Sequence, residues 1–299
     1  MNVTQSLPVI SSSVVLLFSA LVFRRYIARG GAHLLLWGIG LAMFGVSSLA
    51  EVYSAGAWHP TVFRLWYLGG AVLNAAWLGQ GTVYLLRGQH LPNVLISLVL
   101  GYAVASGVVV MVGRLLGVSP GILGLLVAIA GFGLTLILHR RWVYRWNSQR
   151  LAMGLTLLLV AGSLLATYFV FSIPLNDAHF DVHQTLSAQY RELLPQGATI
   201  RRLTPVFNIY GLLTIVGGAL YSAWLLWRKE IAPHRVVGNL FIALGALSLA
   251  FASTLVRFGL GDYLYVGELV AATLMFAGFV LATTPLAATR HALHGVDAS

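Results

Sequence analysis

The chain has 299 residues, of which 59% are hydrophobic and only 9% are charged, and its mean hydropathy is +0.85. Soluble domains carry about 25% charged residues, so this composition excludes an ordinary soluble domain and predicts a surface that mostly faces lipid. The net charge of +10 does not indicate a nucleic-acid partner, because Lys and Arg fall in short clusters between apolar runs. The absence of cysteine excludes disulfides, thiolate metal sites and cysteine nucleophiles.

We predict an all-α, polytopic bundle of nine transmembrane helices that forms one domain over residues 1–299. A helix needs about 20 predominantly apolar residues to cross the hydrocarbon core of a bilayer. Runs of that length recur along the chain, and a proline or a capping residue precedes several of them. The predicted spans are 8–26, 33–53, 62–86, 92–112, 119–138, 151–173, 205–227, 236–257 and 264–286.

The distribution of Lys and Arg predicts the orientation. With the N-terminus outside and the C-terminus in the cytoplasm, twelve of the 18 basic residues fall on the inner side and six on the outer side. This agrees with the excess of Lys and Arg in cytoplasmic loops of membrane proteins. Three of the six outer residues lie in a single long loop, 174–203.

The long outer loop is predicted to contain a short helix over residues 184–194. Its leucines and tyrosine recur at helical spacing, so one face of this helix is apolar. We expect that face to lie in the membrane interface. The residues expected to face the membrane are Leu186, Tyr190, Leu193 and Leu194.

The same loop contains the run DAHFDVH, in which Asp177, His179, Asp181 and His183 alternate. On a helix, two histidines four residues apart could share a metal, and on a strand all four side chains would lie on one side. The glutamate of a zinc-protease HExxH motif is absent. The alternatives are therefore a metal site and a solvated polar loop.

The sequence indicates no cofactor inside the membrane. The only lysine, Lys229, lies at the end of a predicted span, which excludes a retinal Schiff base within the bundle. The nine histidines all lie in predicted loops or at helix ends. Haem held by two histidines at mid-depth is therefore not expected.

Charged and polar residues within the predicted spans are the stronger functional signal, because ionisable groups there are costly and are usually paired or functional. One interpretation is structural: Glu51 pairs with Arg64, and Arg257 pairs with Glu268. The other is a polar pocket that is open to the outer side and reaches Asn74, which is predicted to face the bundle interior. The candidate ligand-binding residues are Glu51, Arg64, Tyr67, Asn74, Asn208, Tyr210, Arg257 and Glu268.

The seventh predicted span is a part of the sequence that resembles other proteins. Residues 204–229, TPVFNIYGLLTIVGGALYSAWLLWRK, begin with a capping threonine and a first-turn proline and end in Arg228 and Lys229. The run resembles a helix of a family of uncharacterised bacterial multi-span membrane proteins, over the C-terminal third of the chain. The resemblance implies a multi-pass protein of the bacterial plasma membrane and implies no activity. Separately, Glu51 and the run RLWYLGGAVLNAAWL make the first three spans resemble the seven-helix input domains of bacterial sensor kinases.

The leading functional hypothesis is a membrane-embedded protein that binds or transports a small or lipophilic ligand from the outer side. A second hypothesis is an accessory subunit of a larger membrane complex, with small-residue seams such as Gly117, Gly121 and Gly124 facing outwards. The seam formed by Gly101 and Ala105 would face outwards for the same reason. A third hypothesis is a metal-dependent intramembrane enzyme that uses the outer loop. The expected partners are the lipid bilayer, a small ligand and other membrane subunits.

Overall fold

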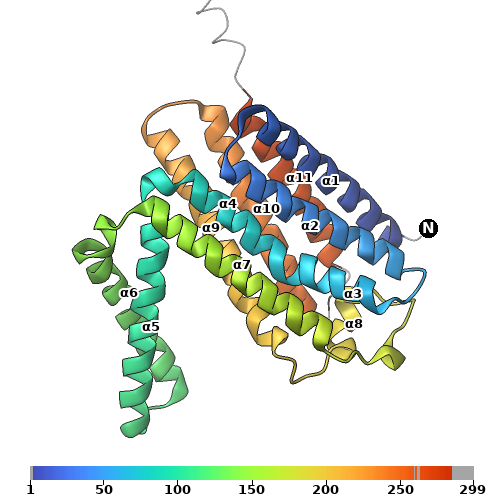
Figure 1. Ribbon diagram of the computed structural model, residues 1–299, viewed down its shortest axis with the longest axis horizontal. Helices are drawn as coiled ribbons and strands as arrows, with labels where there is room; N and C mark the ends of the chain where they lie inside the picture. Colours follow the sequence, from blue (N-terminus) through green and yellow to red (C-terminus); the bar gives the residue numbers. More distant parts are fainter. Residues whose placement is uncertain (1–2, 259, 261–262, 285–299) are drawn as a thin grey trace, which may run out of the picture. The chain divides into compact units, whose positions relative to one another are not determined.

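In the computed structural model, which describes residues 3–258, 260 and 263–284, every regular element is a helix (Figure 1). The elements are α1 (Val3–Arg29), α2 (Ala32–Ser54), α3 (Pro60–Trp66), η1 (Tyr67–Leu73), α4 (Asn74–Leu85), η2 (Arg87–Gln89), α5 (Leu91–Leu115), α6 (Pro120–Arg141), η3 (Val143–Arg145), α7 (Ser148–Ser172), η4 (Asp177–His179), α8 (Leu186–Leu193), α9 (Ile200–Arg228), α10 (Pro233–Arg257) and α11 (Tyr263–Thr283).

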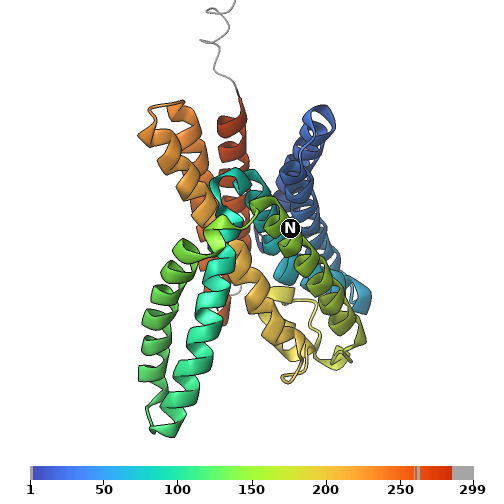
Figure 2. The same ribbon diagram turned by 60° about the vertical axis from the view of Figure 1, so that its left-hand side comes forward.

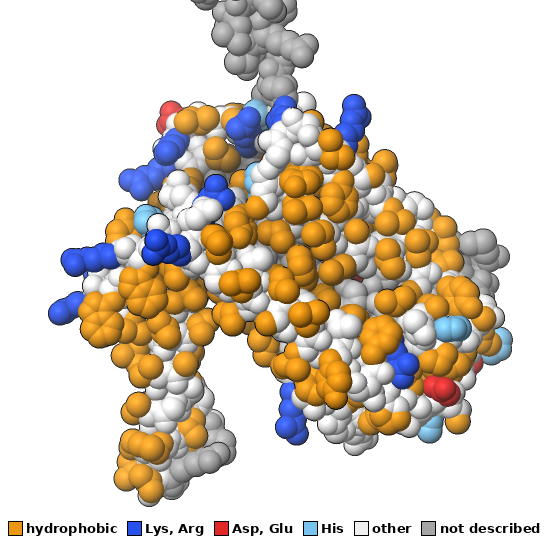
Figure 3. Space-filling model, viewed as in Figure 1, with side chains coloured by type: hydrophobic (Ala, Val, Ile, Leu, Met, Phe, Trp, Pro, Cys, Tyr) orange, Lys and Arg blue, Asp and Glu red, His pale blue; other side chains and the backbone are white. Residues whose placement is uncertain are grey.

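Eight of the described helices are long and apolar enough to cross a membrane by length and composition. They are α1, α2, α5, α6, α7, α9, α10 and α11, and each contains or closely matches one of the predicted spans. The remaining predicted span, 62–86, corresponds to α3, η1 and α4, which follow one another without a break. Hydrophobic side chains cover most of the surface seen in Figure 3, as expected for helices that face lipid.

The middle part of the third predicted span is a π-helix rather than an α-helix. In η1 the backbone N–H of Asn74 bonds to the carbonyl of Gly69, five residues earlier. Such segments are rare and occur often at functional sites. Gly69 and Gly70 lie here against α2, where a Cβ on Gly69 would come within 2.6 Å of the Ser47 hydroxyl oxygen. The missing side chains therefore let α2 and η1 approach closely.

The chain forms two compact units, and Thr82–Gly162 is the smaller one. In it α5 and α6 form a helical hairpin, which Figure 2 shows side by side. The buried Asn93 side chain donates to the carbonyls of Val143 (2.6 Å) and Trp146 (2.9 Å), and so anchors the turn that follows α6. Gly101 lies directly against the backbone of Thr135, so this residue of the predicted outward seam faces inwards.

The larger unit, formed by Met1–Gly81 and Ser163–Ser299, has its core among α1, α2 and α11. On each helix the buried residues recur at intervals of three, four or seven, which makes one stripe. Phe18 of α1 packs against Phe276 and Phe279 of α11, with ring centroids 5.3 Å apart in both pairs. The core stripes are Val15, Phe18 and Val22 on α1, Leu34, Leu41 and Phe44 on α2, and Ala272 and Phe279 on α11.

A second close contact in the larger unit joins α4 to α9. Gly79 and Gly211 face each other, and a Cβ on Gly211 would lie 2.4 Å from the backbone carbonyl of Ala75. A Cβ on Gly79 would lie 3.0 Å from the Gly211 Cα. Glycines at such positions let membrane helices pack backbone to backbone.

The segment between α7 and α9 contains the predicted short helix, but its leucines point elsewhere than predicted. Leu186, Leu193 and Leu194 are almost completely buried within the protein rather than exposed to lipid. Tyr190 is half-buried, and its ring lies near those of Trp66 and Tyr67. An apolar face looks the same in sequence whether protein or lipid covers it, and here protein covers it.

Candidate functional site

The carboxyl group of Glu51 is buried at the last turn of α2, where 6% of the residue is exposed. Its Oε1 atom accepts two hydrogen bonds, from the backbone N–H of Leu186 (2.8 Å) and from the hydroxyl of Tyr265 (2.5 Å). The Tyr265 hydroxyl also bonds to Ser187 Oγ (3.1 Å). The other carboxyl oxygen, Oε2, is buried and has no hydrogen-bond partner among the described residues.

Glu51 serves as the acceptor that the first turn of α8 needs. The first N–H groups of a helix have no partner within the helix, and a negative charge there is stabilising. The N-cap residue of α8, Thr185, makes no side-chain capping bond. The carboxylate of Glu51 takes that place from α2 and so fixes α8 to the bundle.

A second acidic residue lies beside Glu51. Glu268 follows Tyr265 by one turn of α11, is half-buried, and interacts electrostatically with Glu51. Among the described residues, no Lys, Arg or His makes an ion pair with Glu51, so the predicted Glu51–Arg64 pair is not formed. The Arg64 guanidinium instead donates to the carbonyl of Ile173 (2.9 Å) and lies over the ring of Phe171. The predicted partner of Glu268, Arg257, has a side chain outside the described part of the structure.

Unpartnered serine hydroxyls accompany the two acidic residues. Ser11 and Ser48 are at most 4% exposed, and neither Oγ atom has a hydrogen-bond partner within the described ranges of the chain. Most serines in helices donate to the carbonyl four residues earlier, as Ser54 and Ser97 do here. The hydroxyls of Ser11 and Ser48 thus lack even the local bond that a helix normally provides.

The core stripes place these polar residues at one level of the larger unit. Ser48 and Glu51 continue the Phe44 stripe of α2, Ser11 precedes Val15 by one turn of α1, and Glu268 precedes Ala272 by one turn of α11. Val15 of α1, Phe44 of α2 and Ala272 of α11 pack in one core. The polar residues follow them within two turns towards the same end of the bundle, and therefore lie at one level. We call this cluster the Glu51 centre, and it consists of Ser11, Ser48, Glu51, Tyr265 and Glu268.

Other predicted ligand-binding residues join the third predicted span to α9. Tyr67 bonds to Thr204 Oγ1 (3.2 Å), and the Tyr210 hydroxyl donates to the buried Gln80 side chain. Asn208 Nδ2 donates to the carbonyl of Ala71 within the π-helix (3.0 Å). These side chains therefore hold two helices together.

Asn74 is buried, as predicted, with 4% exposure, and its Oδ1 accepts from the adjacent backbone N–H of Ala75. The expectation that Asn74 and Arg64 share one flank assumed 100° per residue, but η1 lies between them and turns by less per residue. The structure does not join Asn74 and Arg64 through a described cavity.

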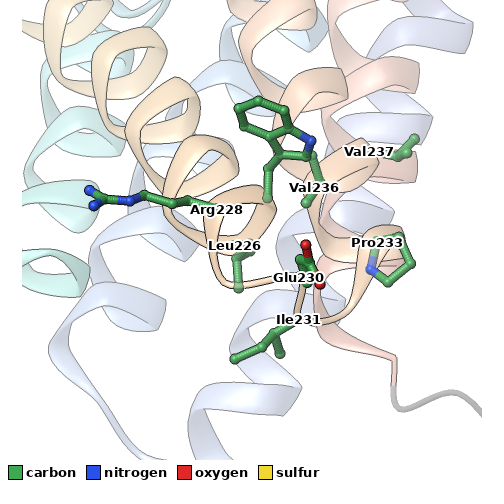
Figure 4. Close-up of a pocket in the computed structure, with 8 residues that line it drawn as sticks. Leu226, Arg228, Glu230, Ile231, Pro233, Val236 and Val237 are labelled. Atoms are coloured by element: carbon green, nitrogen blue, oxygen red, sulfur yellow. The ribbon is translucent and has the colours of Figure 1, made fainter.

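The described pocket lies elsewhere, between the end of α9 and the start of α10 (Figure 4). That pocket has a volume of about 650 Å³ and is lined mainly by apolar side chains, including Leu226, Ile231 and Val237. Figure 4 shows Arg228 extending away from it. It lies at the opposite end of α9 from Thr204 and contains none of the predicted site residues.

The loop residues predicted as metal ligands are not gathered. Asp177 and His179 lie in the short helix η4, and the chain leaves that helix before Asp181. The carboxylate of Asp181 accepts from the backbone N–H of His183 (2.8 Å) and from Gln184 Nε2 (3.2 Å). The metal hypothesis required one helix or one strand across the run, and neither forms. Among the residues that the structure describes, no group of three His, Asp or Glu side chains could hold a metal.

Asn208 offers a test of the contact between α9 and the π-helix. Asn208→Ala removes the bond to the Ala71 carbonyl, and we expect a loss of about 0.6–1.7 kcal/mol in unfolding free energy, the range for such bonds between membrane helices. Unfolding of the purified protein in mixed micelles measures it. Asn239→Ala is the matched control, since that amide bonds only within its own helix. An equal loss in both variants would contradict the assignment.

Sequence reasoning missed Tyr265, Ser11, Ser48 and the Leu186 backbone. Tyr265 precedes the predicted Glu268 by three residues and Ser48 precedes Glu51 by three, so helical spacing could have indicated both. The N–H of Leu186 carries no sequence signal.

Searches against protein-family models, curated proteins and solved structures gave no match to this chain.

Proposed function

We propose that this chain is a bacterial plasma-membrane protein of nine spans, with its N-terminus outside and its C-terminus in the cytoplasm, that binds a small ligand in the Glu51 centre. Eight of these spans are the eight long apolar helices, and the remaining one, third in chain order, is the continuous run of α3, η1 and α4. Asn208 donates to the Ala71 carbonyl within the π-helix, so this carbonyl is not left without a partner in the membrane. In this orientation the Glu51 centre and α8 lie on the outer side, and the ligand enters from there, for binding or for transport.

The observation that carries the proposal is the unpartnered Oε2 atom of Glu51. A buried polar group without a partner costs about 1–3 kcal/mol, and a charged one costs more. A purely structural cap for α8 needs only the oxygen that Leu186 and Tyr265 already use. The second oxygen, with the unpartnered hydroxyls of Ser11 and Ser48 at the same level of the bundle, supports a site that is completed by a ligand.

The absence of cysteine makes a direct test available, because any single cysteine that is introduced is the only thiol in the protein. Ser48→Cys is expected to react with a membrane-impermeant maleimide added outside intact cells. The reaction should be slow, because the residue is buried and α8 is fixed to the neighbouring Glu51. Ser19→Cys is the control, since Ser19 is buried on α1, away from the Glu51 centre, and bonds to the Gly38 carbonyl. It should stay unlabelled.

Labelling of Ser48→Cys only from the cytoplasmic side would overturn the proposed orientation. Equal resistance of both variants, even in permeabilised cells, would show a sealed scaffold and would overturn the proposed ligand site.

A second candidate function is an accessory subunit of a larger membrane complex. It is favoured by Gly121 and Gly124 on α6, where a Cβ would meet nothing within 4 Å, so this small-residue seam faces away from the unit of Thr82–Gly162. Seams of small residues are common where membrane helices associate. Purification in mild detergent as a stable monomer without a co-purifying protein would count against this function.

A further inference from the structure

We infer that the Glu51 centre binds a hard monovalent cation, and Na⁺ is the ion that tests this inference. This inference rests on the proposed function and names the class of ligand. The Glu51 centre combines two carboxyl groups with two serine hydroxyls, and its unpartnered atoms are all oxygens. Hard cations are bound in proteins by oxygen ligands of these kinds.

Charge is the first step of the argument. Glu51 is buried and Glu268 interacts with it electrostatically, so a negative charge on either carboxyl group is costly in an apolar bundle. Among the described residues, neither makes an ion pair with a basic side chain. The hydrogen bonds from Leu186 and Tyr265 offset part of the charge on one oxygen of Glu51. A positive ion beside Oε2 offsets the remainder, since opposite charge favours the ionised form of a buried carboxyl group.

Ligand geometry is the second step. Ser48 and Glu51 are three residues apart on α2, so Ser48 Oγ and Glu51 Oε2 lie on one face of that helix. Ser11 lies at the same level on α1, as the antiparallel contact between Leu16 and Gly45 sets the register of the two helices. None of these three oxygens has a hydrogen-bond partner in the part of the chain that the structure describes. A cation is bound through free oxygen lone pairs such as these.

The size of the ligand set decides between monovalent and divalent ions. The buried oxygens without a partner among the described residues are those of Ser11 and Ser48 and Oε2 of Glu51. The carboxyl group of Glu268, which interacts electrostatically with Glu51, is the further candidate ligand. Ca²⁺ takes about six to eight oxygen ligands, and Mg²⁺ usually keeps several waters. A site whose serine and Glu51 ligands are almost fully buried has little room for retained water. The small ligand set and the lack of room for water therefore fit Na⁺ better than Ca²⁺ or Mg²⁺.

The test uses the full-length protein in neutral detergent, with NaCl exchanged for N-methylglucamine chloride at constant ionic strength. We expect Na⁺ to raise the Tm of the unmodified protein saturably, and radioactive Na⁺ to bind at about one ion per chain. Glu51→Gln should lose the Tm response, and Ser48→Ala should weaken the apparent affinity at least about tenfold. Ser54→Ala is the matched control, because Ser54 lies on the same helix and bonds to the Ala50 carbonyl. Its response should be unchanged.

An equal Tm response in Glu51→Gln and the unmodified protein would overturn the inference, as would a response to Ca²⁺ with none to Na⁺. A Tm that varies with pH but not with Na⁺ would also overturn it, because a proton would then occupy the centre. Failure of the inference is distinguishable from failure of the proposed function. If Ser48→Cys is labelled from outside and Na⁺ has no effect, the site is reachable and its ligand is of another class.

Discussion

Glu51→Ala is expected to release α8 from the bundle and to lower the free energy of unfolding by about 2–4 kcal/mol. The substitution leaves the Leu186 N–H without an acceptor, and an unsatisfied buried group costs about 1–3 kcal/mol. The Tyr265 hydroxyl loses one bond and keeps Ser187 as a partner, which adds about 1 kcal/mol. Hydrogen exchange followed by mass spectrometry should show faster exchange in Leu186–Leu193. The exchange of α9 and α10 should change much less.

Glu51→Gln separates the structural role of this residue from its charge. The glutamine retains an oxygen that accepts from Leu186 and Tyr265, so α8 should stay protected from exchange. If α8 exchanges equally fast in both variants, the negative charge itself holds the helix. If it exchanges slowly in both, Glu51 does not fix α8 and that part of the account is wrong.

Gly211→Val is expected to have the largest effect on folding. Its Cβ would lie 2.4 Å from the carbonyl carbon and oxygen of Ala75, which are backbone atoms that cannot rotate away. Overpacking costs typically about 1–3 kcal/mol, and a clash with backbone should cost at least the upper end of that range because α4 and α9 must separate. Such separation also strains the bond between Tyr210 and Gln80. The expected result is a strongly reduced yield of folded protein and a lower Tm.

Gly217→Val on the same helix is the matched control. A Cβ at Gly217 would meet nothing within 4 Å, so the substitution has the same chemistry without the clash. We expect a Tm close to that of the unmodified protein. Similar losses in both variants would mean that valine disfavours α9 for local reasons and that the contact with α4 is not tight.

The long helices could be predicted from the sequence because a bilayer requires about 20 apolar residues in succession, and that signal is local. The π-helix could not be predicted in this way. It lies at the contact of Gly69 and Gly70 with Ser47 and accepts the bond from Asn208 at Ala71, and both contacts join segments far apart in the chain. Apolar periodicity indicates that a segment is helical and does not reveal how each turn is hydrogen-bonded.

The candidate site was predictable in part. Glu51 and Glu268 stand out in sequence because acidic residues within apolar spans are rare, and in the structure the two residues interact electrostatically. Pairing by opposite charge suggested Arg64 as the partner of Glu51, but the partners are a tyrosine hydroxyl and a backbone N–H of α8. A backbone donor can be found only once the long loop is folded onto the bundle.

The most direct measurement of the central claim, that the Glu51 centre is a ligand site, is an experimental density map of the protein in lipid nanodiscs with NaCl. We predict density that belongs to no protein atom, in contact with Glu51 Oε2 and the hydroxyl of Ser48, with α8 closed over Glu51. A map in which Oε2 bonds to a neighbouring side chain, and in which Ser11 and Ser48 close the space without any added density, would contradict the claim.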